Sequence, residues 1–191
     1  MTQKTKVIYD FDPNNLPTEL LQAVGLLVAA SSQTESIVGH FISAILGIDD
    51  AESISLTAHM SNPLKDQIAR ALIELNATNS DTVDQVDDLL DAINEAYERR
   101  NITVHNSFAR DPETNEVFSF REIARGSTRI ELKPISVDQI KEDAALIYKT
   151  GINLQRFMAL CRIDTARRTR PLRVPLNRKK KARAARQSES V

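Results

Sequence analysis

Two long stretches of the chain repeat apolar residues at alternating steps of three and four, which is the spacing of one buried face of an α-helix. In the first stretch the repeated residues are Val83, Val86, Leu90, Ile93 and Tyr97. In the second they are Val137, Ile140, Ala144, Ile147, Gly151, Leu154, Met158 and Cys161. Such faces are stable in water only when they pack against other elements. The spacing therefore predicts a mainly α fold, an antiparallel helical bundle, with Met158 and Cys161 filling its core.

The residues before the first stripe predict further helices. Residues 1–15 read as an irregular or edge segment, and Pro17 then suits the first position of a helix. That helix is expected to run to about residue 46, where Gly47 can cap its C-terminal end. A short helix is expected within residues 50–61.

Capping signals delimit the remaining helices. Asn62 stands before Pro63, which resembles the start of another helix. Asp81 can cap the helix that carries the first stripe. Ser136 and Gln139 have the spacing of a capping box in front of the second stripe.

Between the two stripes the period changes from that of a helix to that of a strand. Residues 117–121 and 128–132 alternate apolar and polar side chains about a turn that contains Gly126. This pattern predicts a β-hairpin, at about residues 116–133, inserted between the two helices. Because an isolated hairpin is marginal in water, we expect it to pack on the helices.

Charge is divided unevenly along the chain. From Arg162 to the end there are 11 Lys or Arg residues against two acidic ones, a charge of +9. Residues 1–161 hold 14 basic and 24 acidic residues, a charge of −10. We therefore expect three parts: the N-terminal segment 1–15, one helical domain over residues 16–163, and a basic, disordered tail over residues 164–191.

The basic residues are candidates for nucleic-acid binding, because Lys and Arg can neutralise phosphates without sequence preference. An equally open interpretation is a solvated arm that folds back on the acidic body. The candidate residues for phosphate contacts are Arg99, Arg167, Arg168, Arg170, Arg173, Arg178, Lys179, Lys180 and Lys181.

The composition indicates a cytoplasmic protein without a metal or cofactor. The single cysteine cannot form an intrachain disulfide, and the N-terminal residues lack the apolar core of a signal peptide. The longest apolar run, residues 23–30, is too short to span a bilayer, so no membrane partner is expected. His40 and His59 have no spacing typical of zinc ligands, and there is no glycine-rich phosphate loop.

One position of the first stripe carries a charge. Beyond its apolar residues the next step falls on Arg100. A guanidinium on a core-facing stripe costs desolvation unless it is paired or faces a cleft. The neighbouring Arg99 has Glu95 four residues earlier as an ion-pair partner, whereas Arg100 has Ala96 at that distance. We expect a second protein surface or a bound anion to compensate the charge of Arg100.

Two polar residues follow Arg100 on the same helix. Asn101 and His105 lie four residues apart, so they share one face. An ideal helix turns Arg100 and His105 about 140° away from each other. They can meet only through a long reach, a distortion near His105, or a second copy of the chain.

The pattern Arg100-Asn101-x-x-x-His105 resembles the Arg-polar-x-x-x-His motif of the HEPN superfamily, the higher-eukaryote and prokaryote nucleotide-binding proteins. The resemblance covers roughly residues 16–163. It implies a small helical bundle that carries the motif towards the end of a long helix, and a homodimer in which both motifs line one cleft. It also implies a metal-independent endoribonuclease that acts on RNA, in the setting of a toxin or a phage-defence effector with an antitoxin partner.

The resemblance assigns roles to three residues. His105 would be the general base that takes the ribose 2′-hydroxyl proton, since an ordinary histidine is largely neutral near pH 7. Arg100 would stabilise the charge on the phosphate, and Asn101 would position His105 or the phosphate. Some HEPN toxins carry a tyrosine two residues after the histidine, where a partner adds adenylate groups. This chain has Ser107 there, so silencing by that route is not expected.

Other interpretations stay open. His105 can simply interact with the C-terminal end of the helix dipole, and Arg100 can pair with a carboxylate on another helix, such as Glu35 or Asp66. The chain could be a HEPN-like module that binds nucleotides or a protein without catalysis. It could also bind nucleic acid through its basic tail alone.

Overall fold

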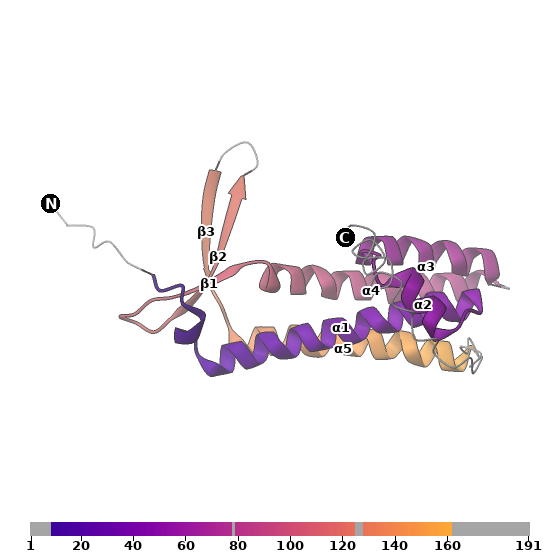
Figure 1. Cartoon of the computed structure of the whole chain (residues 1–191), viewed down its shortest axis with the longest axis horizontal. Coiled ribbons are helices and arrows are strands. Elements are labelled where there is room, and N and C mark those ends of the chain that lie inside the picture. The colour runs from indigo at the N-terminus through magenta and orange to yellow at the C-terminus, as the bar shows by residue number, and fades with distance from the viewer. Residues whose placement is uncertain (1–8, 78, 125–127, 162–191) are drawn as a thin grey trace, which may run out of the picture.

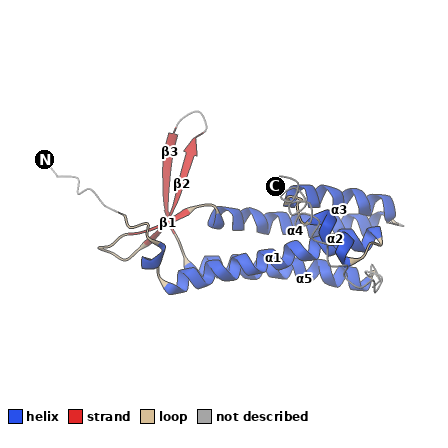
Figure 2. Ribbon diagram, in the orientation of Figure 1, coloured by secondary structure: helices blue, strands red, loops and turns tan. Residues whose placement is uncertain are grey.

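The computed structural model describes residues 9–77, 79–124 and 128–161, and the described part is mainly helical (Figures 1 and 2). The helices are α1 (Thr18–Leu46), α2 (Asp50–Thr57), α3 (Asn62–Asn76), α4 (Ser80–Val104) and α5 (Val137–Leu160), and a short 3-10 helix spans Pro13–Asn15. The strands are β1 (Ser107–Arg110), β2 (Val117–Ala124) and β3 (Thr128–Pro134). The prediction of a mainly α fold with a hairpin between the two stripe helices is confirmed. The basic tail and the turn at Gly126 lie outside the described residues.

Residues with capping preferences set the ends of the long helices. Gly47 ends α1 in the left-handed conformation, with φ at 64°, as predicted. Pro17 is the N-cap of α1 and not its first residue. The prediction for α4 was wrong, because the amide oxygen of Asn79, and not Asp81, accepts from the Thr82 backbone N–H at 2.9 Å. Ser136 Oγ accepts from the backbone N–H of Gln139 at the start of α5.

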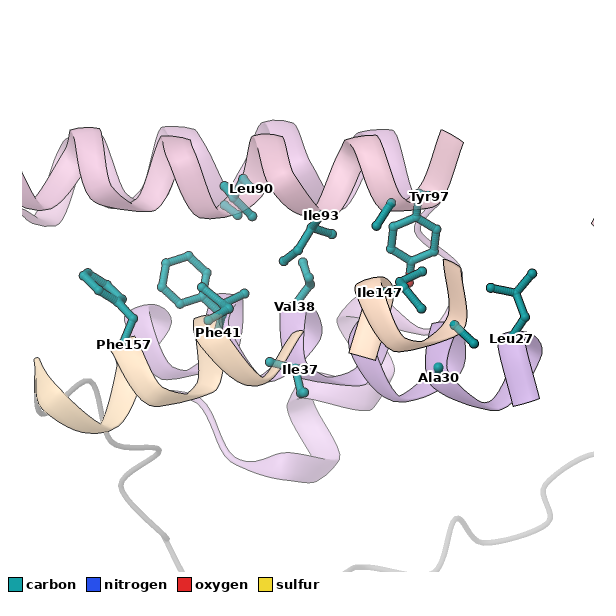
Figure 3. Packing of buried hydrophobic residues seen from close by; sticks show 14 of the residues in the cluster. Leu27, Ala30, Ile37, Val38, Phe41, Leu90, Ile93, Tyr97, Ile147 and Phe157 are labelled. Carbon is teal, nitrogen blue, oxygen red and sulfur yellow. The ribbon is translucent and has the colours of Figure 1, made fainter. Parts of the chain in front are cut away.

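The core lies between α4 on one side and α1 and α5 on the other, and α4 runs antiparallel to both (Figures 1 and 3). Leu90, Ile93 and Tyr97 of α4 point towards Phe41 of α1 and Ile147 of α5 (Figure 3). Burial of these apolar side chains contributes most of the stability of such a bundle. The two predicted stripes therefore face the same core.

Helices α1 and α5 approach each other closely at a glycine. A Cβ atom on Gly151 would lie 2.5 Å from Thr34 Oγ1, which is too close for any side chain at this position. Thr34 Oγ1 also donates to the Ile147 carbonyl at 2.8 Å. The second stripe continues to Met158, but Cys161 is exposed. The prediction that Cys161 fills the core was wrong, because α5 ends at Leu160 and the cysteine follows as its C-cap.

The strands form one antiparallel sheet in the order β1-β2-β3. Strand β1 was not predicted. The main chain of Asp10 pairs with that of Arg110 through two hydrogen bonds of 2.8 Å, so the N-terminal segment extends the sheet edge. The rings of Tyr9 and Phe11 pack edge-on against Phe118 and Phe120.

The hairpin rises away from the helical bundle (Figure 1). Among the described residues, contact with the core is seen at the base of the hairpin, where Val117 and Ile135, which follows β3, pack against buried residues. We expected the hairpin to pack on the helices, whereas its support comes mainly from β1 and the N-terminal segment. Among the described helices, none is both long and apolar enough to cross a membrane.

Candidate functional site

The C-terminal end of α4 carries the three motif residues. The helix is regular to Val104, and His105 is its C-cap, whose backbone N–H donates to the Asn101 carbonyl at 3.2 Å. The His105 side chain is exposed. Because no distortion interrupts the helix before His105, Arg100 and His105 leave it in different directions, as the ideal geometry predicts.

The Arg100 guanidinium is half-buried and has no carboxylate partner within 4 Å among the described residues. Its Nε is sealed from solvent without a hydrogen-bond acceptor, and one terminal nitrogen donates to Asn101 Oδ1 at 3.0 Å. A sealed donor without an acceptor costs on the order of 1–3 kcal/mol. The fold therefore gives Arg100 a defined position while leaving its charge uncompensated.

The carboxylates suggested as internal partners of Arg100 are occupied by other residues. Glu35 accepts from Lys65 Nζ at 2.6 Å, and Lys65 is buried. Asp66 accepts from Arg70 at 3.1 Å and from Asn94 at 3.0 Å. The hypothesis that Arg100 pairs with Glu35 or Asp66 was wrong.

Tyr97 lies one turn before Arg100 and shows which way the arginine faces. Its hydroxyl donates to the Ser31 carbonyl at 2.8 Å. Burial raises the pKa of Tyr97, the charge of Glu35 raises it further, and the charge of Arg100 acts in the opposite sense. Arg100 is thus close enough for its field to reach the phenol, on the core-facing side of α4.

His105 lines an open depression of about 760 Å³ where α4 meets the sheet. Asn101 and Ile102 contribute from the helix, Phe120 and Arg121 come from β2, and the remaining lining residues are Phe11, Asn106 and Ser107. Arg100 does not line this depression. The structure brings Asn101 and His105 together, and it connects Arg100 to them only through the hydrogen bond to Asn101.

A second depression of about 500 Å³ adjoins the first and shares Ile102, Asn106 and Arg121 with it. It extends between the end of α4, the base of the hairpin and the start of α5. Just beyond the end of α4, the Asn106 amide donates to Ser119 Oγ at 2.8 Å and so links this helix end to β2. Arg121 was missed because the strand that carries it becomes adjacent to His105 only through the sheet register.

Arg99 is the one residue proposed for phosphate contacts that the structure describes. It donates to Glu95 Oε1 at 2.6 Å, as predicted, and this hydrogen bond raises the pKa of Arg99. Its other terminal nitrogen lies 3.9 Å from Asp143, and the side chain lines the second depression. The remaining proposed phosphate contacts fall in residues 167–181, outside the described residues.

Neither a cluster of metal-ligating side chains nor a comparison with other proteins assigns this site. Within the described ranges, no three or more His, Cys, Asp or Glu side chains converge as metal ligands would. Comparison of the chain with family models, with curated proteins and with solved structures gave no match in any of the three.

Proposed function

We propose that this chain is a metal-independent endoribonuclease of the HEPN type, a toxin or phage-defence effector that acts on RNA in the cytoplasm. One observation carries the proposal. Of the Lys and Arg side chains on the described helices, three are not exposed: Lys65, Arg70 and Arg100. The first two have carboxylate partners, and Arg100 has none in the described part. A phosphate is the anion that a guanidinium in this position would receive.

The chemistry needs no metal because the nucleophile belongs to the substrate. His105 accepts the proton of the ribose 2′-hydroxyl, and the oxygen attacks the adjacent phosphorus. The bond from phosphorus to the 5′-oxygen breaks, and that oxygen takes up a proton from solvent. The products are a 2′,3′-cyclic phosphate and a 5′-hydroxyl end. General-base catalysis of this kind contributes about 10²- to 10⁴-fold.

Asn101 supports both partners of this reaction. Its side-chain oxygen holds the Arg100 guanidinium, and its side chain lines the same depression as His105. Donors fixed before the substrate arrives stabilise developing charge without a cost of reorganisation. We propose that Arg100, held in place by its hydrogen bond to Asn101, binds the phosphate of the RNA.

A homodimer would bring the separated groups together. Arg100 and His105 leave α4 on different faces, so one protomer presents them to different surroundings. A second copy that packs against the end of α4 places two Arg100 and two His105 side chains around one RNA strand.

The test is RNA cleavage by the purified full chain in the presence of EDTA. We expect products that end in a 2′,3′-cyclic phosphate, and we expect His105→Ala to lower the rate by at least 10²-fold. His40 is also an exposed helix histidine and lines neither depression, so His40→Ala is the matched control. Equal cleavage by the parent chain and His105→Ala, at equal thermal stability, would refute the proposal.

Absence of cleavage by the parent chain together with measurable binding of RNA would instead support a non-catalytic module. Truncation after residue 163 then separates two forms of that alternative. Loss of nearly all nucleic-acid affinity and of its salt dependence assigns binding to the tail. Retained affinity assigns it to the end of α4.

A further inference from the structure

The second depression contains a nearly buried carboxylate that the proposed cleavage chemistry does not use. Asp143 of α5 is 7% exposed and lines the wall of this depression. Its Oδ1 accepts from Gln139 Nε2 at 3.2 Å, and Arg99 lies 3.9 Å away, beyond hydrogen-bond distance. Among the described residues, no donor reaches Oδ2. A carboxylate has about four acceptor sites, so Asp143 retains acceptor capacity that faces the depression.

The other walls combine positive charge with apolar surface. Arg99, Arg121 and Lys133 supply three cations, and Glu131, besides Asp143, supplies the other acid, 3.6 Å from Lys133. Apolar wall surface comes from Ile102, Pro134, Ile135 and Ile140. A volume of about 500 Å³ is within the usual range of small-ligand sites. The apolar walls suit a flat ring, the carboxylate of Asp143 suits N–H donors on one edge of that ring, and the cations suit an attached phosphate.

We propose that the second depression is a guanine-selective subsite that seats one nucleobase of an RNA substrate. The consequence for cleavage rests on the proposed ribonuclease function, whereas base recognition does not. Guanine presents two adjacent donors, N1–H and N2–H, which match the two oxygens of Asp143. Adenine offers one donor beside an acceptor on that edge, and cytosine and uracil each offer a single donor. Single-stranded RNA exposes this edge for recognition.

The shared wall fixes how the subsite relates to His105. Ile102, Asn106 and Arg121 border both depressions. A guanine beside Asp143 places its ribose and phosphate over these three residues, with Arg121 as the phosphate contact. The neighbouring ribose then enters the depression that His105 lines. The enzyme therefore cuts next to an unpaired guanosine.

Calorimetric titration of the full chain with nucleoside monophosphates tests base recognition without catalysis. GMP is expected to bind about tenfold or more tightly than AMP and than IMP, which lacks the N2 amino group. This comparison changes only the ligand, so it does not depend on how a variant folds. Equal affinity for GMP, IMP and AMP overturns the guanine assignment.

A variant assigns the selectivity to its residue. Asp143→Asn replaces one acceptor oxygen with a donor, and we expect it to remove the difference between GMP and IMP and to strengthen AMP binding, because an amide matches the adjacent donor and acceptor of adenine. Asp138→Asn is the matched control, because Asp138 is exposed five residues earlier on α5 and does not line the depression. Persistence of the difference between GMP and IMP in a folded Asp143→Asn chain overturns the role of Asp143.

RNA oligonucleotides distinguish a base within RNA from a free nucleotide. A 2′-O-methyl oligonucleotide with one unpaired guanosine is expected to displace GMP, and failure to displace it overturns the RNA assignment. In a cleavable oligonucleotide, replacing that guanosine with inosine is expected to slow cutting about tenfold. Equal cleavage rates for the guanosine and inosine oligonucleotides would overturn the proposed subsite without contradicting the proposed ribonuclease function. Guanine-selective binding without cutting refutes the nuclease and leaves the subsite standing.

Discussion

The two ends of α4 place arginines in contrasting surroundings. Beside the N-terminal half of α4, Arg70 of α3 reaches Asp66 on its own helix and Asp87 and Asp91 on α4, at 2.6 to 3.1 Å. Burial alone would lower the pKa of Arg70, yet the hydrogen bonds that Arg70 donates to Asp66 and Asp91 raise it. Near the C-terminal end, Arg100 has only an uncharged amide. The first arginine joins two helices, whereas the second keeps its charge available.

The difference teaches that residue type alone does not separate a structural arginine from a functional one. Both guanidinium groups are partly buried, and both belong to helices of the same bundle. What separates them is whether the acidic residues of neighbouring helices come within reach. At one end the acidic residues of α4 are one turn apart and face α3, and at the other end no carboxylate arrives within 4 Å among the described residues.

Replacing Arg100 should give the largest effect on function and a small effect on stability. Arg100→Ala is expected to lower RNA cleavage about 10²- to 10³-fold, the usual cost of losing one group that stabilises developing charge. The melting temperature should stay within a few degrees, because no ion pair is lost. The control is Arg156→Ala, an exposed arginine of α5. Cleavage at the parent rate by the Arg100 variant would contradict the contrast between a structural Arg70 and a functional Arg100.

Converting Asn101 to aspartate should make the C-terminal end of α4 resemble the other end. Asn101→Asp places a carboxylate oxygen where the amide oxygen now accepts from Arg100 at 3.0 Å. The new ion pair compensates the guanidinium and repels phosphate, so we expect cleavage to fall about 10- to 100-fold. The ion pair and the unfavourable helix-terminus charge nearly cancel in stability. Single-turnover rates check the first expectation, and an undiminished rate contradicts it.

Replacing Arg70 should lower the stability of the chain and leave RNA cleavage unchanged, the reverse of what is expected for Arg100. Arg70→Ala leaves three carboxylates close together without their cation and is expected to destabilise the chain by about 1–2 kcal/mol. Cleavage measured well below the melting temperature should be unchanged. Chemical denaturation of the variant and the parent chain gives the free energy of unfolding. A variant that loses activity but not stability would show that the two arginines had been assigned the wrong way round.

The N-terminal segment offers the smallest expected effect. Hydrogen bonds from the Asp12 backbone and the Asn15 amide, with the charge of Arg110, lower the pKa of the Asp10 carboxyl from its ordinary value of 3.8. A lowered folded-state pKa stabilises the fold above the unfolded value, and the contribution is lost as pH falls through the folded pKa. Parent and Asp10→Asn should therefore differ slightly in melting temperature at pH 6 and converge below pH 3.8. A difference that grows on acidification would contradict this.

Most of the helical architecture could be predicted from the sequence, because apolar spacing reports directly which face of a helix is buried. Leu90 and Ile147 are examples that the structure confirms. Helix ends were less predictable, since Asn79 and Asp81 are both good caps and only the local turn decides between them. The exposure of Cys161 was not predicted, because the apolar spacing does not indicate the residue at which the helix ends.

The candidate site could be predicted only in part. The break at Arg100 is visible because it violates the local period, and the structure leaves that side chain without a carboxylate partner in the described part. Asp143 and Arg121 have no such signal, because each fits its own helix or strand. Arg121 becomes a neighbour of the motif helix through the unpredicted strand β1 and the register of β2, in which Ser107 faces Phe120. Asp143 becomes one through the packing of α5 against α4, where it lies 3.9 Å from Arg99. Contacts of this kind depend on the tertiary fold.

The pairing of α1 with α5 has a consequence for how the chain is made. The threonine of α1 that meets Gly151 donates to a carbonyl 113 residues further along. During synthesis on a ribosome, the apolar face of α1 is made long before α5, the helix against which it mainly packs. A nascent chain stalled before residue 137 would display that side unprotected, which favours chaperone capture or aggregation. Completion of the helical bundle is thereby postponed until α5 has been synthesised.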